Sequence, residues 1–211
     1  MPMPTDKITD LTKTARALNK RDFECAVVPD ANEAAKTLLQ YIPPEAVVGI
    51  GGSVTIRELG IIGKLEARGN AVIPHWQPGL TEETDRKLRR QEGLADYYLT
   101  SANAITEQGE IINIDGIGNR VAHMIYGPEN VIIVAGYNKI VPDIDAGIAR
   151  SKEIAAALNA QRVGSKTPCA KTGKCVDCDA PGRICRVITI IQYRPWQTKI
   201  KVLLVNEKLG F

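Results

Sequence analysis

The sequence lacks long apolar runs and blocks of one charge. No apolar stretch approaches the roughly 20 residues that a membrane span needs, and residues 1–7 have no apolar core of the kind found in signal peptides. The 27 basic and 24 acidic residues leave a net charge of +3 without a long basic block, which gives no indication of nucleic-acid binding. We therefore expect a cytoplasmic protein with no membrane span and no nucleic-acid partner.

Histidine is also scarce, and no internal repeat or low-complexity tract is present. One of the two histidines, His75, lies in a predicted loop over residues 74–79. It has the chemistry of a base or a metal ligand. A loop histidine that stacks beside Trp76 or faces solvent is the commoner case, and we favour that interpretation.

Segments with strand and helix patterns alternate along most of the chain. The 211 residues, 44% of them apolar, are enough to bury one core, and the alternation predicts a three-layer α/β/α fold. Helices are expected over residues 5–20, 56–69 and 142–158. We treat residues 1–211 as a single domain, in which 164–186 form a cysteine-rich metal-binding loop and 187–211 carry two C-terminal strands, paired as a hairpin or flanking the sheet.

A buried strand followed by a glycine turn occupies residues 46–55. Glycines here let a ligand approach the backbone, and the following helix start favours an anion. The alternative is a tight turn in which Ser53 is an ordinary N-cap. No Gly-Lys-Ser/Thr follows the glycines, so the turn is not a nucleotide P-loop.

Further polar residues follow a predicted hairpin over residues 103–115. Asn113 and Asp115 share one face of its second strand, and Arg120, just after two glycines at a helix start, has a side chain that can grip an anion bidentately. We expect a pocket that holds an anionic small molecule. Its predicted ligand-binding residues are Gly51, Gly52, Ser53, Thr55, Asn113, Asp115, Asn119 and Arg120.

Four of the five cysteines fall within seventeen residues, whereas Cys25 stands alone in a predicted strand as a packing thiol. The clustered residues are Cys169, Cys175, Cys178 and Cys185. Four thiolates on one loop suit a tetrahedral zinc ion or a four-iron cluster. The outer gaps of five and six residues are wider than zinc ribbons usually have and also differ from the common ferredoxin spacing. Of the two metals we favour a 4Fe–4S iron–sulfur cluster over zinc. Free or partly disulfide-bonded thiols on a loop are the other interpretation.

Three segments, 51–60, 100–109 and 113–122, resemble the lactate-utilization (LUD) domain family. Residues 134–141, the cysteine loop and the terminal Leu-Gly-Phe extend the resemblance over nearly the whole chain. Family members are bacterial and archaeal proteins connected, in some systems, with lactate oxidation together with iron–sulfur partner subunits. The resemblance implies a redox or accessory role in 2-hydroxy-acid metabolism and iron–sulfur or other redox partner proteins. A homo-oligomer is left open.

The resemblance also implies the fold of the ribose-5-phosphate isomerase and coenzyme A-transferase superfamily. In the isomerases a similar glycine turn binds the sugar phosphate. In the transferases a glutamate before a glycine is the nucleophile, and the turn at 106–109 looks similar, so Glu107 is the candidate catalytic residue. The hairpin alone also fits a merely solvent-facing Glu107. The alternative function is therefore a transferase or sugar-phosphate enzyme that uses Glu107, with structural zinc in the cysteine loop. The acidic and lysine segments of the isomerases are not found.

Overall fold

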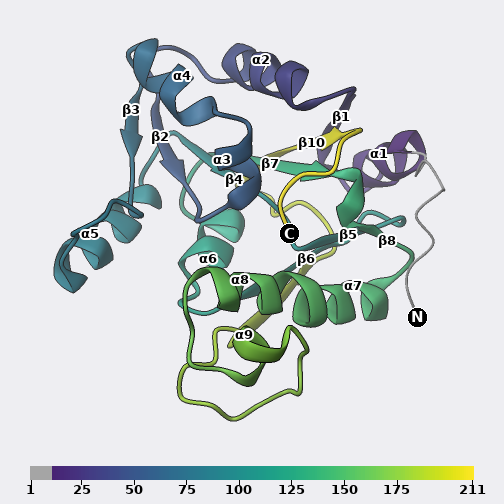
Figure 1. Ribbon diagram of the computed structural model, residues 1–211. Coiled ribbons are helices and arrows are strands. Elements are labelled where there is room, and N and C mark those ends of the chain that lie inside the picture. Colours follow the sequence, from purple (N-terminus) through teal and green to yellow (C-terminus); the bar gives the residue numbers. More distant parts are fainter. Residues whose placement is uncertain (1–10) are drawn as a thin grey trace.

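A computed structural model describes residues 11–211, and its centre is a six-stranded parallel sheet (Figure 1). The first predicted helix lies partly outside the described residues, and within them α1 spans Leu11–Asn19. The strands, in spatial order, are β1 (Glu24–Val28), β10 (Lys199–Val205), β7 (Asn130–Gly136), β4 (Tyr97–Thr100), β2 (Val47–Ile50) and β3 (Ala71–Ile73).

Helices cover both faces of this sheet, which confirms the predicted three-layer α/β/α arrangement. On one face lie α2 (Ala31–Tyr41), α3 (Val54–Glu58) and α4 (Ile61–Ala67). On the other lie α1 and α6 (Asn119–Ile125). Side chains of β7 alternate between the two cores, with Ile132 in the first and Ile133 in the second, so the strand is apolar on both faces.

A second sheet packs beside α1 and α6 and carries its own helix. Its strands, in spatial order, are β8 (Ile140–Val141), β5 (Ala104–Thr106), β6 (Ile111–Asp115) and β9 (Val187–Ile191). The β5–β6 pair is the predicted hairpin. Helix α7 (Ile144–Arg150) covers the outer face of this sheet, where Gly147 lies against Ile112 and leaves no room for a Cβ.

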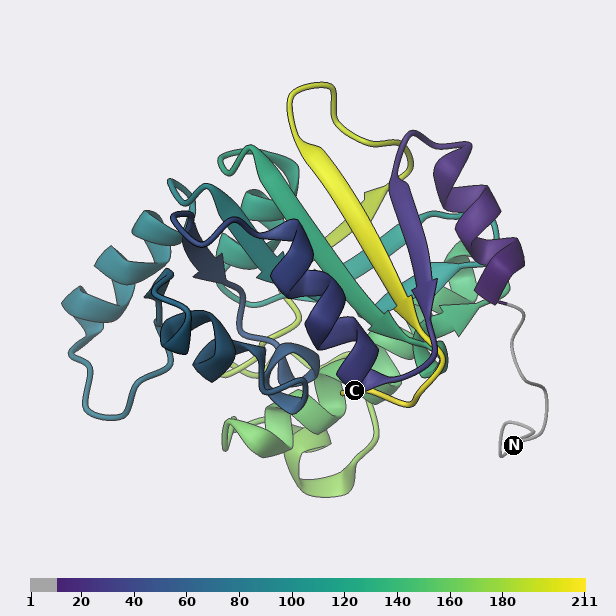
Figure 2. The ribbon, with the colours of Figure 1, turned by 90° about the horizontal axis from the view of Figure 1, so that it is seen from above.

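Of the two arrangements expected for the C-terminal strands, the hairpin does not form. Strand β9 pairs antiparallel with β6 in the second sheet, whereas β10 lies between β1 and β7 in the central sheet (Figure 2). The burial of the two strands explains this separation. Four consecutive residues of β10, Val202–Val205, are fully buried, as in an interior strand, while β9 exposes three of its five residues.

Two predicted helices are also interrupted or extended. The helix after the glycine turn divides into α3 and α4 at Gly60, whose φ of +59° is left-handed. The helix expected at 142–158 begins after Asp143, whose side chain accepts a hydrogen bond from the Ala146 amide. It then continues through a π-helical segment, Ser151–Ala156, into α8 (Ala157–Arg162).

The remaining helices are α5 (Glu82–Glu92), capped by Thr81, and α9 (Pro168–Thr172) within the cysteine loop. None of the helices formed by residues 11–211 is long and apolar enough to cross a membrane.

Candidate functional site

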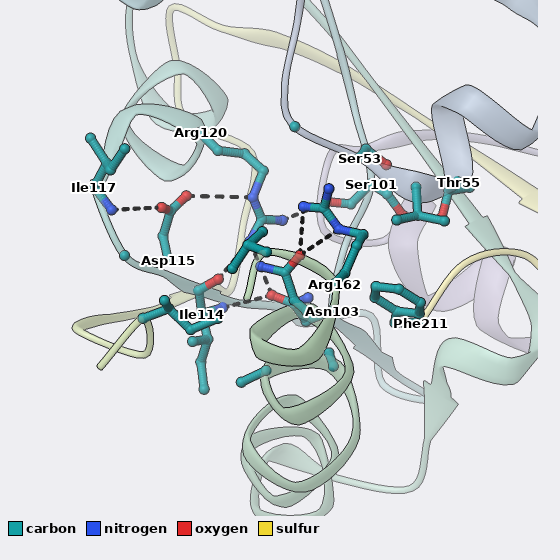
Figure 3. Close-up of a pocket in the computed structure, with 18 of the residues that line it drawn as sticks. Ser53, Thr55, Ser101, Asn103, Ile114, Asp115, Ile117, Arg120, Arg162 and Phe211 are labelled. Carbon is teal, nitrogen blue, oxygen red and sulfur yellow. Dashed lines mark hydrogen bonds and ion pairs between the residues drawn. The ribbon is translucent and has the colours of Figure 1, made fainter. Parts of the chain in front are cut away.

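A cavity of about 270 Å³ lies at the carboxyl edge of the central sheet (Figure 3). Residues that directly follow β2, β3, β4 and β7 line it. Strand β2 lies between β3 and β4 in the sheet. The connection from β2 leads to β3 on one side of it and the next connection leads back to β4 on its other side, so the two connections diverge at the carboxyl end of β2. Ligands of open α/β sheets bind in crevices of this kind. Opposite the sheet, the cavity is closed by the π-helical segment, by α8 and by Ile184 of the cysteine loop.

The cavity carries a surplus of positive charge. Among residues 11–211 its lining includes four cationic side chains and one acidic side chain, that of Asp115. Two of the cations have carboxylate partners: Arg120 pairs with Asp115, and Arg89 pairs with Asp85. The other two are Lys139 and Arg162. The Arg162 guanidinium is held by the Asn159 side chain, one turn earlier on α8. Such a lining attracts an anion.

Lys139 is the most unusual of these cations because it is 3% exposed. Its Nζ donates hydrogen bonds to Thr55 Oγ1 and to Ser101 Oγ, both at 2.9 Å, and it forms no ion pair with a carboxylate of the described residues. Burial, together with the charges of Arg150 and Arg120, lowers the pKa of Lys139 to about 7, and the Glu58 carboxylate, which does not contact it, opposes this only in part. An anionic ligand would supply the missing counter-charge.

Arg120 is placed differently from the prediction. All five of its guanidinium N–H groups face protein acceptors: the side chains of Asn103, Asn113 and Asp115 and the carbonyls of Ser101 and Ile114. With no donor left over, Arg120 ties the loop after β4 to β6 and forms a wall of the cavity. Figure 3 shows its guanidinium turned toward Asp115.

The glycine turn lies on the opposite side of the cavity. Gly52, Ser53 and Thr55 line it, and Ser53 Oγ accepts a hydrogen bond from the Ile56 amide, as the N-cap interpretation required. Gly51 lies behind them, where a Cβ would come 2.8 Å from the Tyr98 hydroxyl. The helix that follows has only five residues. We therefore assign the attraction for anions to side-chain cations and not to this helix start.

The other three predicted binding residues surround Arg120. Asn113 lies behind the lining and joins Arg120 to the Asn103 amide. Asp115 accepts hydrogen bonds from the amides of Ile117 and Gly118. Asn119 lines the cavity, and its buried Nδ2 has no hydrogen-bond partner among the described residues. Asn119 therefore has a free donor for a ligand.

Glu107 does not line the cavity. It follows β5, and its carboxylate, 39% exposed, forms a 2.8 Å ion pair with Lys13 of α1. The turn after it packs against α1, where a Cβ at Gly109 would lie 2.9 Å from the Ala17 backbone. The geometry thus places Glu107 away from the predicted pocket residues, and its catalytic role stays a prediction.

His75 lies deeper than expected for a loop histidine. It stacks edge-on against Trp76, as predicted, but it is 5% exposed and its Nδ1 contacts the carboxylate of Glu92, which is fully buried. It also lines the cavity. Lys139, Arg162 and His75 were missed as site residues. A signal for Lys139 and His75 was available, because each comes soon after an apolar strand, where the carboxyl edge of a parallel sheet places functional side chains.

The four clustered cysteines meet at a second, smaller pocket. Cys169, Cys175, Cys178 and Cys185 all line it, and each is a half-buried free thiol. Arg183 braces the loop by donating to the carbonyls of Cys178 and Cys185. Among residues 11–211 no group of three or more Cys, His, Asp or Glu side chains is arranged to hold a metal ion. The thiols therefore surround one space without converging on one point.

Fold and cavity together define an α/β protein with a cationic ligand site at the carboxyl edge of a parallel sheet. The LUD domain matches residues 11–205, and the chain belongs to the LUD domain family. A crystal structure of a DUF162 family protein from Deinococcus radiodurans has a similar fold, with a TM-score of 0.51 and 15% sequence identity over 97% of this chain and 100% of that chain. No curated protein matches the sequence.

Proposed function

We propose that this LUD-domain protein binds a small carboxylate, of the 2-hydroxy-acid class, and serves as an iron–sulfur redox or accessory subunit in its metabolism. The observation that carries the binding function is Lys139. A buried ammonium that has two hydroxyl partners and no carboxylate of residues 11–211 in contact lacks a directly paired counter-charge. A carboxylate in the cavity supplies that charge without a change of fold.

The size of the cavity supports a small ligand. Its volume of about 270 Å³ lies just below the range of roughly 300–1,000 Å³ that is usual for small-molecule sites. The Nδ2 of Asn119 and the guanidinium of Arg162 add donors for carboxylate oxygens. These features support an organic acid of a few carbon atoms over a nucleotide or a coenzyme A ester as the occupant.

The cysteine pocket supports the cofactor proposal through its donor set. Four thiols of one loop surround it, and Arg183 and Lys152 lie beside them to offset thiolate charge. Zinc bound by four thiolates at about 2.3 Å needs the sulfurs to converge. A four-iron cluster also takes four cysteine thiolates as ligands, and the four cysteines of this loop line one pocket. Bound by these cysteines, such a cluster supplies one-electron transfer.

The position of the two pockets supports a joint role. Ala156 and Ile184 line both of them, so two side chains form the partition between the cationic cavity and the cysteines. A redox group held by the cysteines would then lie next to the bound acid.

The cofactor proposal is tested by anaerobic purification followed by iron, sulfide and zinc analysis. We expect iron and sulfide in equal amounts, and we expect Cys175→Ser to abolish them. Cys25→Ser is the matched control, because Cys25 lies in β1 and burial raises its thiol pKa to about 12. Stoichiometric zinc, or no metal after anaerobic purification, would contradict the iron–sulfur proposal.

The ligand proposal is tested by a thermal-shift screen of carboxylates, phosphates and acyl-coenzyme A esters. We expect small carboxylates to raise the melting temperature of the natural protein and to have no effect on Lys139→Met. A shift with acyl-coenzyme A esters alone would instead favour the transferase alternative with Glu107, for which the geometry offers no specific observation.

A further inference from the structure

The side chains of His75 and Glu92 form a buried pair behind the glycine turn. His75 follows β3, and Glu92 is the last residue of α5. The Nδ1 of His75 contacts Glu92 Oε1, while the second oxygen, Oε2, has no hydrogen-bond partner among the described residues. The nearest arginine on α5, Arg89, is already paired with Asp85 at 2.7 Å. His75 is thus the group that directly compensates this buried carboxylate.

The free edge of the imidazole faces the cavity. Since Nδ1 is occupied, Nε2 is the nitrogen that remains for a ligand, and it makes no hydrogen bond to a residue of the described chain. A Cβ built on Gly52 would lie 3.4 Å from this atom. Gly52 is exposed and both residues line the cavity, so the absence of a side chain at position 52 leaves His75 Nε2 open.

His75 and Lys139 flank the same short segment. Gly52 faces His75 at one end of it, and Thr55 accepts the Lys139 hydrogen bond at the other. Both side chains also line the same cavity of about 270 Å³. An acid bound there can be oriented with its carboxylate at Lys139 and its hydroxyl toward His75.

We propose that His75 and Glu92 are a proton-transfer pair for this cavity, in which His75 Nε2 takes the proton from the O–H group of a bound 2-hydroxy acid. The substrate O–H bond breaks, an Nε2–H bond forms, and the oxygen keeps the electron pair. The imidazolium so formed lies against the Glu92 carboxylate, which stabilises it. Glu92 is a positioning residue, because it acts through the ring. The inference rests on the proposed function, since it requires a carboxylate in the cavity.

The burial of the pair supports this division of roles. Burial raises the pKa of Glu92, and the contact with His75 opposes that rise, so the carboxylate depends on the ring for its charge. The other charged or titratable groups near the pair are Arg89 and Asp85 of α5 and the Tyr98 hydroxyl of β4. These three groups are the same in every comparison in which only the ligand or only Glu92 is changed.

The test is NMR of the full-length protein labelled with ¹⁵N-histidine, with glycolate and acetate as probes. The chain has two histidines, and His123→Gln assigns the signals and serves as the matched control. We expect Nδ1 to carry the proton in the free protein. Glycolate should shift the Nε2 resonance of His75, and acetate, which lacks the hydroxyl, should bind without that shift. In His75→Gln the affinity preference for glycolate over acetate should disappear.

The role of Glu92 has a readout of its own. Glu92→Gln keeps the shape of the side chain but removes its charge, so glycolate should move the His75 Nε2 resonance less while acetate still binds with unchanged affinity. A purely structural Glu92 would leave the Nε2 response to glycolate unchanged, and that result would overturn its part. Binding of both acids with equal affinity and no movement of Nε2 would overturn the role of His75 while leaving the anion site intact. Failure of both acids to bind would refute the proposed function and this inference with it.

Discussion

The Lys139 ammonium donates a 2.9 Å hydrogen bond to the Thr55 hydroxyl and so connects the end of β7 to the helix after the glycine turn. A second bond of the same length reaches Ser101, after β4. One lysine thus joins three strand ends of the central sheet at the cavity. Because burial opposes its charge, the ionisation of Lys139 should govern both the stability of the free protein and its affinity for anions.

Replacing Lys139 with methionine should stabilise the ligand-free protein at low pH. The pKa of Lys139 is about 7 in the fold and about 10.5 in its absence, so below pH 7 both states hold the proton and the full penalty of burying it applies. Between pH 7 and 10.5 the unfolded chain holds more protons, and folding becomes more favourable as pH rises. We expect Lys139→Met to gain about 2–4 kcal/mol at pH 6 and little at pH 10, measured by urea unfolding. Lys87→Met, on the exposed side of α5, should show neither effect.

Carboxylate binding should be accompanied by proton uptake. A bound anion stabilises the charged form of Lys139, so its pKa of about 7 in the free protein rises in the complex. Affinity should therefore fall as pH increases from 7 to 9, by at most about tenfold per pH unit. Calorimetry of acetate binding in two buffers of different ionisation enthalpy measures the protons taken up. An affinity that is constant over this range would show that Lys139 does not contact the anion.

Arg120 should contribute mainly to the stability of the fold, and Arg162 mainly to carboxylate binding. Arg120→Met removes the guanidinium that donates to the buried Ser101 and Ile114 carbonyls and pairs with Asp115, and should cost about 3 kcal/mol or more of stability. Arg162→Met loses a bond to Asn159 within one exposed helix turn, should change stability by less than about 0.5 kcal/mol, and should weaken carboxylate binding. Chemical unfolding and titration of both variants distinguish the roles. Equal destabilisation by the two substitutions would contradict this assignment.

Neighbouring glycines of the turn provide a similar contrast. In Gly51→Ala the new methyl would lie 2.8 Å from the Tyr98 hydroxyl and 2.9 Å from Thr100 Oγ1, both in the buried core of β4. Overpacking of this kind costs about 1–3 kcal/mol. In Gly52→Ala the methyl would lie at van der Waals distance from His75 Nε2, so the fold should retain its stability. The Nε2 response to glycolate should weaken, and a full response in Gly52→Ala would contradict the open edge of the ring.

Short-range features of the fold could be predicted from the sequence. The N-cap Ser53 accepts a hydrogen bond from the amide three residues later, as its sequence context indicated. The hairpin at 104–115 and the alternation of strands and helices followed from residue spacing alone. The separation of β9 from β10 could not be predicted, because both are β-branched runs of similar pattern. Only pairing with strands distant in sequence, β6 for one and β1 and β7 for the other, distinguishes them.

The sequence by itself determined the family, the layered fold and the grouping of four cysteines on one loop, because each depends on residue types at fixed spacing. Tertiary structure decided which polar side chains are available to a ligand. In the sequence, Arg120 had the chemistry of a free anion-binding side chain, but in the fold its guanidinium faces five protein acceptors. Lys139 and His75 carried no such signal, and the fold buries Lys139 beside two hydroxyl groups and places Glu92 against His75. The availability of a donor or a charge depends on every group that surrounds it, and those groups come together only when the chain folds.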